Sequence, residues 1–318
     1  MGVSRRGALL LMGPTGAGKS DIALELAQRF PFEIVSVDSA QVYRGMDIGT
    51  AKPDLATRER IPHHLIDIRD PTMSYSAGEF LRDAGEAMRD IWGRGRQPLL
   101  VGGTMLYFHA LSSGLAVLPG ADARIRVQLD EQAAAHGWES LHQELTRVDP
   151  EAAARIHVND PQRIQRALEV YRATGLPISH LQRNRRTLFE GVEVLEFAAA
   201  PSDRIDLHRR IAGRFEEMLA QGFLDEVRAL FERSDLTAEH PSMRAVGYRQ
   251  AWTYLAGRCD LDELKEQAVA ATRQLAKRQL TWLRRRHLAT WLNSMQPHAA
   301  SRVTNALSEC GFAGWSYV

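Results

Sequence analysis

A glycine-rich segment at residues 13–20 carries residue types at a spacing that suits phosphate binding. It reads GPTGAGKS, follows the apolar run 8–12 and precedes 21–27, whose apolar residues repeat at helical spacing. Strand, glycine-rich loop and helix form the context that the pattern GxxxxGK[ST] requires. The glycines let backbone N–H groups approach an anion, and the helix start adds the positive end of its dipole. The segment predicts a site for a di- or triphosphate.

Two side chains at the end of this loop predict its chemistry. Lys19 supplies a point charge for a terminal phosphate, and the Ser20 hydroxyl is a ligand for Mg²⁺. Lysine is rare here, with four among the 40 Lys and Arg residues. A random match to the whole pattern therefore has a probability on the order of 10⁻³. The alternative is a glycine turn that only caps a helix.

A carboxylate is predicted beside this loop. Asp38 directly follows the segment 32–37, which reads as a short buried strand, and the 19 residues from Lys19 to Asp38 suit one helix and one strand of a βαβ unit. The carboxyl ends of parallel strands face the ligand crevice of an open sheet. Asp38 is a candidate general base there. The alternatives are a magnesium ligand and a residue that caps a loop.

Further segments extend the predicted sheet. The run 63–68 reads as a short strand, 75–92 as a helix and 98–101 as a buried strand that ends in Gly102-Gly103-Thr104. Adjacent His63 and His64 point to opposite faces of a strand, so we expect structural roles instead of a shared metal.

The character of the chain changes at about residue 121. Strand-like runs disappear, and the segment up to 186 is polar, helical in period and rich in arginine. The alternating run 192–197 predicts a strand that rejoins the sheet. We therefore expect an α/β fold, with a parallel sheet flanked by helices and an inserted all-helical domain. The predicted boundaries are 1–120 and 189–318 for the two parts of the core and 121–188 for the insertion. The tail after Trp291 has no recognisable motif, and its pattern is weak beyond Pro297.

Composition narrows the class of protein. The formal net charge is +1 over 318 residues, so the overall charge does not by itself indicate a nucleic-acid partner. Cys259 and Cys310 are too few for a disulfide framework or a four-cysteine zinc site. No stretch approaches the ~20 apolar residues of a membrane span. We expect a cytoplasmic protein with no membrane association, and nothing points to an obligate protein partner.

A strongly basic helix is predicted near the end of the chain. The segment 273–287 holds six Arg or Lys residues and no acid. On a helical wheel Arg273, Lys277 and Arg284 share one face, which Arg278 and Arg285 widen. The opposite face is apolar but is interrupted by Gln279 and Arg286. A solvated face normally mixes signs, so a stripe of one sign favours contact with a polyanion such as folded RNA.

These pieces resemble one known family. The chain is similar to the bacterial tRNA dimethylallyltransferases, also called tRNA isopentenyltransferases. The matching segments, in the family's order, are GPTGAGKS (13–20), VDSAQVYRGMDIGTAKP (37–53), HHLIDI (63–68), YSAGEF (75–80), VGGTMLYF (101–108), PQRIQRALEVYRATG (161–175), MRAVGYRQ (243–250) and the basic helix.

The resemblance implies a reaction and a fold. It implies transfer of a dimethylallyl group from dimethylallyl diphosphate to N6 of adenine 37 of tRNA, with Mg²⁺ as cofactor. It implies a P-loop NTPase-like sheet whose phosphate loop binds the donor's diphosphate instead of ATP. The helical insertion is expected to grip the anticodon stem-loop.

The resemblance also assigns roles to residues. Asp38, Lys19, Thr104 and Arg214 are expected in the reaction channel, although Arg214 by its own pattern reads as a surface helix residue. The implied diphosphate site is Gly13, Pro14, Thr15, Gly16, Ala17, Gly18, Lys19 and Ser20. The implied tRNA contacts are Asp38, Ser39, Ala40, Gln41, Thr104, Arg126, Gln162, Arg163, Ile164, Gln165, Arg166, Met243, Arg244, Ala245, Val246, Gly247 and Tyr248, and the basic helix adds Arg273, Lys277, Arg278 and Arg284.

Two other functions compete with this one. A small-molecule kinase would use the loop on ATP, with Asp38 as base for a substrate hydroxyl. That reading leaves the basic helix and the arginine-rich insertion without a role. A non-catalytic, nucleotide-dependent RNA-binding switch would use the basic surfaces but leaves Asp38 without one.

Overall fold

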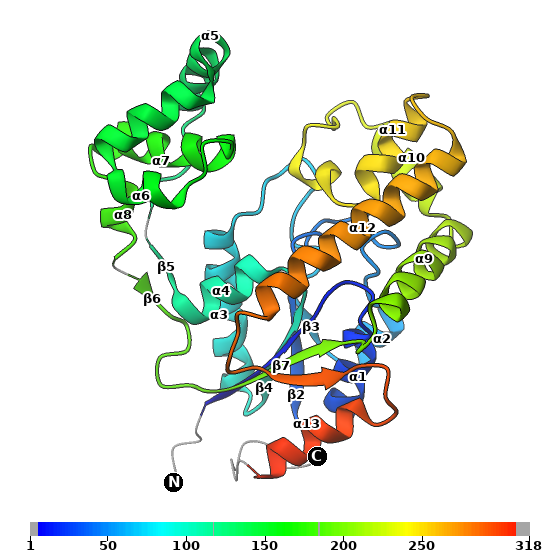
Figure 1. Cartoon of the computed structure of the whole chain (residues 1–318). Helices are drawn as coiled ribbons and strands as arrows, with labels where there is room; N and C mark the ends of the chain where they lie inside the picture. The colour runs from blue at the N-terminus through cyan, green and yellow to red at the C-terminus, as the bar shows by residue number, and fades with distance from the viewer. Residues whose placement is uncertain (1–5, 117, 184, 310–318) are drawn as a thin grey trace. The chain divides into compact units, whose positions relative to one another are not determined.

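The computed structural model describes residues 6–116, 118–183 and 185–309 (Figure 1). The chain forms two compact units. The smaller is Ala110–Leu188, and the larger joins the segments before and after it. Among the described residues no helix is both long and apolar enough to cross a membrane.

A six-stranded sheet organises the larger unit, and every strand pair in it is parallel. The strands, in spatial order, are β3 (His63–His64), β2 (Phe32–Val37), β4 (Gln97–Gly102), β1 (Gly7–Met12), β7 (Glu193–Ala200) and β8 (Thr290–Asn293). Strands β1 and β2 are buried along their whole length, as expected when helices cover both faces of a parallel sheet. The predicted α/β fold is confirmed, and the strand predicted at 192–197 pairs with β1.

Helices connect these strands or follow them in the chain. They are α1 (Lys19–Arg29), α2 (Leu55–Arg60), α3 (Ala77–Gly93), α4 (Met105–Ser113), α9 (Arg204–Ala220), α10 (Phe223–Phe231), the 3₁₀ helix η1 (Pro241–Arg244), α11 (Tyr248–Leu255), α12 (Leu261–Leu283) and α13 (Ala299–Glu309). Helix α3 begins with a capping box, in which Ser76 and Glu79 each bond the other's backbone N–H. In the core, Leu26 of α1 packs with Leu9 and Phe197 of the sheet.

The strand predicted at 63–68 is shorter in the structure. Only His63 and His64 are extended and paired, because Leu65 and Asp67 adopt positive φ values of 65° and 58°. The turn brings the Asp67 carboxylate to Lys52, whose ammonium group lies within 2.5 Å. The histidines have separate partners, since His64 bonds Glu33 and His63 bonds the Ile61 carbonyl.

The end of the chain contains two elements that the sequence did not predict. Strand β8 pairs with β7 at the edge of the sheet, and α13 packs Val303 and Leu307 into the core beside α1. The basic helix is also longer at its start and shorter at its end than predicted. Helix α12 begins after Asp260, which caps it, and stops at Leu283, before Arg284 and its two successors. Cys310 lies outside the described residues.

The smaller unit is helical apart from one pair of short strands. Its helices are α5 (Ala123–Val148), α6 (Pro150–Arg155), α7 (Pro161–Thr174) and α8 (Ile178–Leu181), and its antiparallel strands are β5 (Leu115–Ala116) and β6 (Arg185–Arg186). Helix α5 is interrupted at Gly137, which has φ 77° and ψ 158°. Leu129, Leu145 and Leu168 belong to a separate hydrophobic core. The predicted insertion, 121–188, lies wholly within this unit.

Candidate active site

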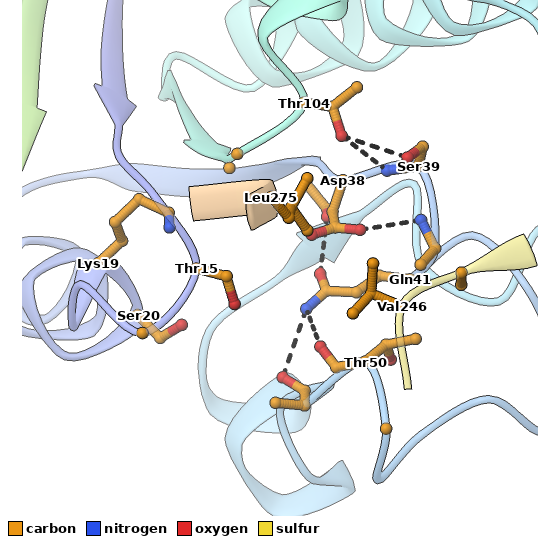
Figure 2. Close-up of a pocket in the computed structure, with 18 of the residues that line it drawn as sticks. Thr15, Lys19, Ser20, Asp38, Ser39, Gln41, Thr50, Thr104, Val246 and Leu275 are labelled. Atoms are coloured by element: carbon orange, nitrogen blue, oxygen red, sulfur yellow. Dashed lines mark hydrogen bonds between the residues drawn. The ribbon is translucent and has the colours of Figure 1, made fainter. Parts of the chain in front are cut away.

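A cavity of about 730 Å³ lies in the larger unit, where strands β1, β2 and β4 end. Its wall includes the phosphate loop, the residues that follow β2 and β4, and side chains of α9 and α12. Figure 2 shows Lys19 and Ser20 on one side of this space and Asp38 and Gln41 on the other. Ligands of open parallel sheets bind at this edge.

The phosphate loop has the backbone that its glycines permit. Gly16 and Gly18 have φ values of 77° and 76°, which favour glycine. At Gly13 an added Cβ would lie 2.3 Å from the Ala199 carbonyl oxygen, so no side chain fits. The Lys19 ammonium group donates to the Pro14 carbonyl at 2.8 Å and therefore folds back over the loop.

Two cations and one carboxylate interact in this cavity. The pKa of Lys19 is lowered to about 8, mainly by burial and then by the nearby charge of Arg214, while Asp38 opposes the shift. Burial likewise lowers the pKa of Arg214, against the attraction of Asp38. Arg214 lines the cavity from α9, so it is not the surface residue that its own pattern indicated. Two partly buried cations near one carboxylate leave an excess of positive charge that suits a diphosphate.

Short hydrogen bonds fix the segment after β2. The Asp38 side chain lines the cavity, and its carboxylate accepts the Ala40 backbone N–H at 2.8 Å. Thr104 follows β4, and its hydroxyl oxygen accepts the Ser39 backbone N–H at 3.0 Å. The two strand ends are thereby joined at the point where Asp38 enters the cavity.

Gln41 is held at both ends of its amide. Its carbonyl oxygen accepts the Ser36 hydroxyl at 2.8 Å, and its amide nitrogen lies 3.3 Å from the carbonyl oxygens of both Thr50 and Ala51 (Figure 2). The orientation of Gln41 therefore depends on the loop that contains Thr50. These hydrogen bonds fix the orientation in which the Gln41 amide would face the edge of a nucleobase.

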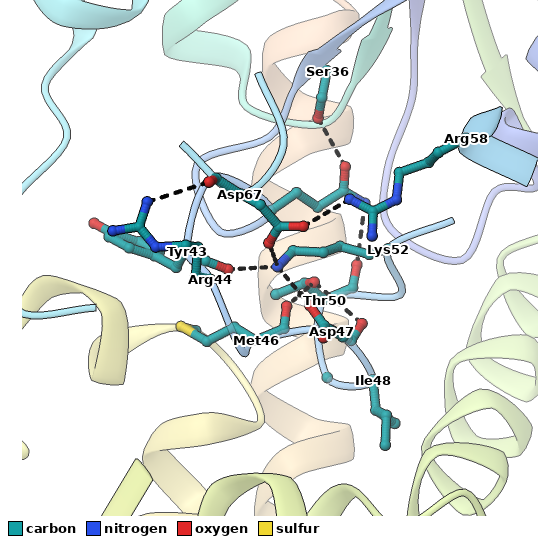
Figure 3. A network of polar contacts seen from close by, with 12 residues as sticks. Ser36, Tyr43, Arg44, Met46, Asp47, Ile48, Thr50, Lys52, Arg58 and Asp67 are labelled. Carbon is teal, nitrogen blue, oxygen red and sulfur yellow. Dashed lines mark hydrogen bonds and ion pairs between the residues drawn. The ribbon is translucent and has the colours of Figure 1, made fainter. Parts of the chain in front are cut away.

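A buried lysine holds that loop together. The Lys52 side chain is 1% exposed, and its ammonium group donates to the carboxylates of Asp47 and Asp67 and to the Tyr43 carbonyl (Figure 3). Arg58 of α2 adds a second cation to Asp67 at 2.7 Å. The buried ammonium group of Lys52 thus has carboxylate partners, which is the condition under which a buried ion is tolerated.

Glu226 of α10 also holds the loop, and the sequence analysis missed it. One carboxylate oxygen accepts the N–H groups of Asp47 and Ile48, each at 2.7 Å. The other accepts Gly49 N–H at 3.1 Å and the Tyr248 hydroxyl at 2.6 Å. Three successive N–H groups thus form an anion site that a side chain of the same protein fills. No local pattern in α10 signals this contact.

The predicted segment 243–248 contributes to the wall of the cavity. Arg244, Ala245, Val246 and Gly247 line it, whereas Met243 is buried away from it. Tyr248 also lines the cavity, and its buried hydroxyl donates to Glu226. Arg244 also pairs with the exposed Glu239 at 2.9 Å.

Helix α12 has two distinct faces. Leu275, Arg278 and Gln279 line the main cavity, whereas Arg273 and Lys277 are exposed on the outside. A second hollow of about 370 Å³ includes Lys277 and Arg278 in its wall. Arg284 is exposed beyond the helix end. Arg286 has a structural role, because its guanidinium group forms an ion pair with Glu196 of β7.

The remaining predicted residues belong to the smaller unit. Arg126 and Arg166 pair at 2.8 and 2.7 Å with Glu169, whose side chain is completely buried. Those two arginines therefore stabilise the unit's interior whatever else they bind. Ile164 is part of the unit's core, while Gln162 and Arg163 are exposed. Gln165 bonds Asp130 at 2.7 Å.

The side chains around the loop fit only one kind of metal binding. The Ser20 hydroxyl and the Asp38 carboxylate both line the cavity. Among the described residues no group of three or more His, Cys, Asp or Glu side chains could hold an ion. Mg²⁺ commonly takes one or two protein oxygens and completes its shell with substrate phosphates and water. The donor set therefore fits a Mg²⁺ that arrives with a diphosphate.

Comparison with known proteins identifies the family. The model for "IPP transferase" matches residues 41–286, and the model for "Isopentenyl transferase" matches residues 6–67. The chain belongs to the IPP transferase family. It is 58% identical over 278 residues to a tRNA dimethylallyltransferase of Nitrosococcus oceani, covering 87% of this chain and 88% of the relative. A tRNA dimethylallyltransferase of Stenotrophomonas maltophilia is 54% identical, with 97% and 98% coverage.

Solved structures agree with this family. The full-length tRNA isopentenylpyrophosphate transferase of Bacillus halodurans is 34% identical, with a TM-score of 0.70 over 96% of both chains. A eukaryotic dimethylallyltransferase acting on tRNA is 27% identical, with a TM-score of 0.82 over 98% of this chain and 81% of that one. The predicted resemblance is confirmed, and the chain is a prenyltransferase enzyme. A small-molecule kinase is not favoured.

Proposed function

We propose that this enzyme transfers a dimethylallyl group from dimethylallyl diphosphate to N6 of adenine 37 of tRNA. One observation supports this most: a single cavity holds the phosphate loop with Lys19 on one side and the carboxylate of Asp38 on the other. The groups that would bind the donor's diphosphate and the group that would deprotonate the acceptor therefore line the same cavity. In the reaction the bond from N6 to C1 of the donor forms, the bond from C1 to oxygen breaks, and diphosphate leaves.

The phosphate loop and two cations serve the leaving group. Charge grows on the diphosphate as the carbon–oxygen bond breaks, and Lys19, Arg214 and backbone N–H groups of the loop are placed to stabilise it. Ser20 would hold Mg²⁺, which when bound neutralises part of the same charge. Because these interactions strengthen as the charge develops, they accelerate the reaction more than they improve binding of the donor.

Asp38 serves the nucleophile. An exocyclic adenine amine is weakly nucleophilic because its lone pair is delocalised into the ring, and the amine must lose a proton as it is alkylated. Asp38 lies across the cavity from the phosphate loop and is our candidate for the base that takes this proton. The target base has to leave its stack to reach such a site, as other base-modifying enzymes require.

Basic surfaces serve the tRNA. The exposed cations Arg273 and Lys277 of α12, with Arg284 beyond its end, present positive charge next to the cavity wall. In the insertion, 121–188, the exposed Gln162 and Arg163 are candidates for gripping the anticodon stem-loop. A cytoplasmic location and the absence of an obligate protein partner stay predictions from the sequence.

One assay tests the proposed function. The protein is incubated with Mg²⁺ and unmodified tRNA, and with either radiolabelled dimethylallyl diphosphate or γ-labelled ATP. We expect label to enter the tRNA only from the prenyl donor. Label transfer from ATP to a small molecule would support a kinase, and RNA binding with no transfer from either donor would support a switch. Either of these results contradicts the proposal.

A further inference from the structure

Gln279 is a polar residue on the apolar side of α12, and the structure gives it two partners. Its amide is buried, with 8% of the residue exposed. The carbonyl oxygen accepts the Thr15 backbone N–H at 2.9 Å, and the amide nitrogen donates to the Gly103 carbonyl at 2.8 Å. One side chain therefore connects the phosphate loop to the turn after β4.

The bond to Thr15 changes which N–H groups of the loop remain for an anion. The Thr15 N–H already has an acceptor, so the diphosphate must use other donors of the loop. The same bond fixes the loop's first turn against α12. Because the amide is buried, removing it would leave a backbone N–H and a carbonyl without partners, which is costly in a protein interior.

The bond to Gly103 reaches the other side of the cavity. A Cβ at Gly103 would lie 2.4 Å from the Gln279 amide nitrogen, so the close approach requires glycine. The next residue is Thr104, whose hydroxyl binds the Ser39 backbone beside Asp38. Gln279 thus contacts both the loop that would hold the diphosphate and the turn that supports the candidate base.

We propose that Gln279 is a positioning residue that sets the spacing between the diphosphate site and the Asp38 side of the cavity. It does so from the helix whose outer face carries Arg273 and Lys277, so the element that presents cations to RNA also holds the phosphate loop. This inference rests on the proposed function for its link to prenyl transfer. Its link to diphosphate binding does not depend on that function.

The chain offers a matched control at the other end of the same strands. Gln97 begins β4 and is buried, with 3% exposed, and its side-chain oxygen accepts the Gly7 backbone N–H of β1 at 3.1 Å. Gln97→Met and Gln279→Met each remove a buried glutamine side chain that accepts a hydrogen bond from a backbone N–H group, of Gly7 and Thr15 respectively. Only Gln279 lies at the cavity.

The test measures binding of inorganic pyrophosphate with Mg²⁺ by calorimetry, and single-turnover transfer from dimethylallyl diphosphate to tRNA. Gln279→Met should weaken pyrophosphate binding about tenfold, the size expected from losing one or two hydrogen bonds. The transfer rate at saturating substrates should fall at least as much, while the Kd for tRNA stays within about twofold. Gln97→Met should lower the melting temperature similarly and leave all three quantities near the wild-type values.

The outcomes separate this inference from the proposed function. If Gln279→Met binds pyrophosphate as Gln97→Met does, the positioning role is wrong, whatever the transfer rate. If the wild-type protein transfers no prenyl group, the proposed function is wrong, while the pyrophosphate comparison still decides the role of Gln279. Should Gln279→Met not fold, Gln279→Asn with Gln97→Asn repeats the comparison, since the shorter amide cannot span both partners.

Discussion

Lys19 and Arg214 place two cations where burial opposes their charge. The pKa of Lys19 falls to about 8 because it is buried and because Arg214 lies near it. A diphosphate bound in the loop would supply the missing counter-charge and raise this pKa again. At the scale of single residues, the site is therefore incomplete until an anion binds, and binding should be linked to protonation of Lys19.

This linkage predicts the pH dependence of donor binding. Below pH 8 Lys19 is mostly protonated in the free protein, so affinity for dimethylallyl diphosphate should be nearly constant. Above pH 8 the free lysine loses its proton while the bound form keeps it, so the Kd should rise up to about tenfold per pH unit. Titrations of the donor without tRNA, from pH 6.5 to 9.5, measure this directly.

Lys19→Arg is the matched variant, since a guanidinium group keeps its charge over that range. Its Kd should be flat above pH 8, whatever its absolute value. If the wild type and Lys19→Arg show the same rise, another group is responsible and the linkage to Lys19 is wrong.

At the scale of elements, the loop between β2 and α2 is held from outside by α10. Glu226 binds three successive N–H groups of this loop, and Gly49 packs where a Cβ would lie 2.3 Å from the Phe223 ring. The same loop supplies the carbonyl groups of Thr50 and Ala51 that orient Gln41. Helix α10 therefore influences the orientation of Gln41 through this loop.

Glu226→Gln should disturb the loop without touching the phosphate site. An amide replaces one acceptor oxygen with a donor that faces backbone N–H groups, so we expect a stability loss of about 2–3 kcal/mol. The KM for tRNA should rise severalfold, while pyrophosphate binding stays unchanged. Chemical denaturation, steady-state kinetics and calorimetry give these three values. Asp225→Asn removes an exposed carboxylate from the same helix and should change none of them. A tRNA KM in Glu226→Gln equal to that of Asp225→Asn would contradict the role.

Helix α12 predicts a salt effect. Replacing Arg273, Lys277 and Arg284 by Ala should raise the KM for tRNA and reduce the slope of log affinity against log salt by up to about 3. The KM for dimethylallyl diphosphate should hardly change, because these side chains are exposed outside the main cavity.

The control is a triple variant of exposed arginines on α1 and α3, Arg29, Arg82 and Arg89. It removes a similar amount of charge and should leave the slope unchanged. Equal slopes in the two triple variants would mean that α12 is an ordinary solvated helix.

At the scale of the whole molecule, local patterns predicted the frame of the fold and only part of the site. Buried strands β1, β2 and β4 were predictable because each is a short, mostly apolar run next to turn residues. Strand β8 was not, because it has four residues, two of them exposed, and depends on β7 for its pairing. The hydrogen bonds of Glu226 join residues that are 177–179 positions apart in the chain. Contacts of this kind leave no pattern in the local sequence.

Residues within helices show the same limit. The wheel of the predicted helix 273–287 marked Gln279 and Arg286 as exceptions on an apolar face. Both have specific partners, although Arg286 lies beyond the end of α12. Arg214 had no signal of its own, and only the family resemblance assigned it to the channel that the structure lets it line. A polar residue that interrupts an apolar helix face therefore indicates a specific buried partner. On a polar face, the sequence pattern does not distinguish a site residue such as Arg214 from a solvated one.

We propose that one cavity joins a diphosphate site to a base at Asp38. Asp38→Asn keeps the size and the hydrogen-bonding capacity of the side chain but cannot take up the N6 proton. The decisive measurement is the single-turnover rate of transfer to tRNA at saturating donor. We expect a loss of roughly 10²–10⁴, the range typical of a general base, with the melting temperature and the affinities for pyrophosphate and tRNA little changed. A folded Asp38→Asn enzyme with a near-normal single-turnover rate would contradict the claim.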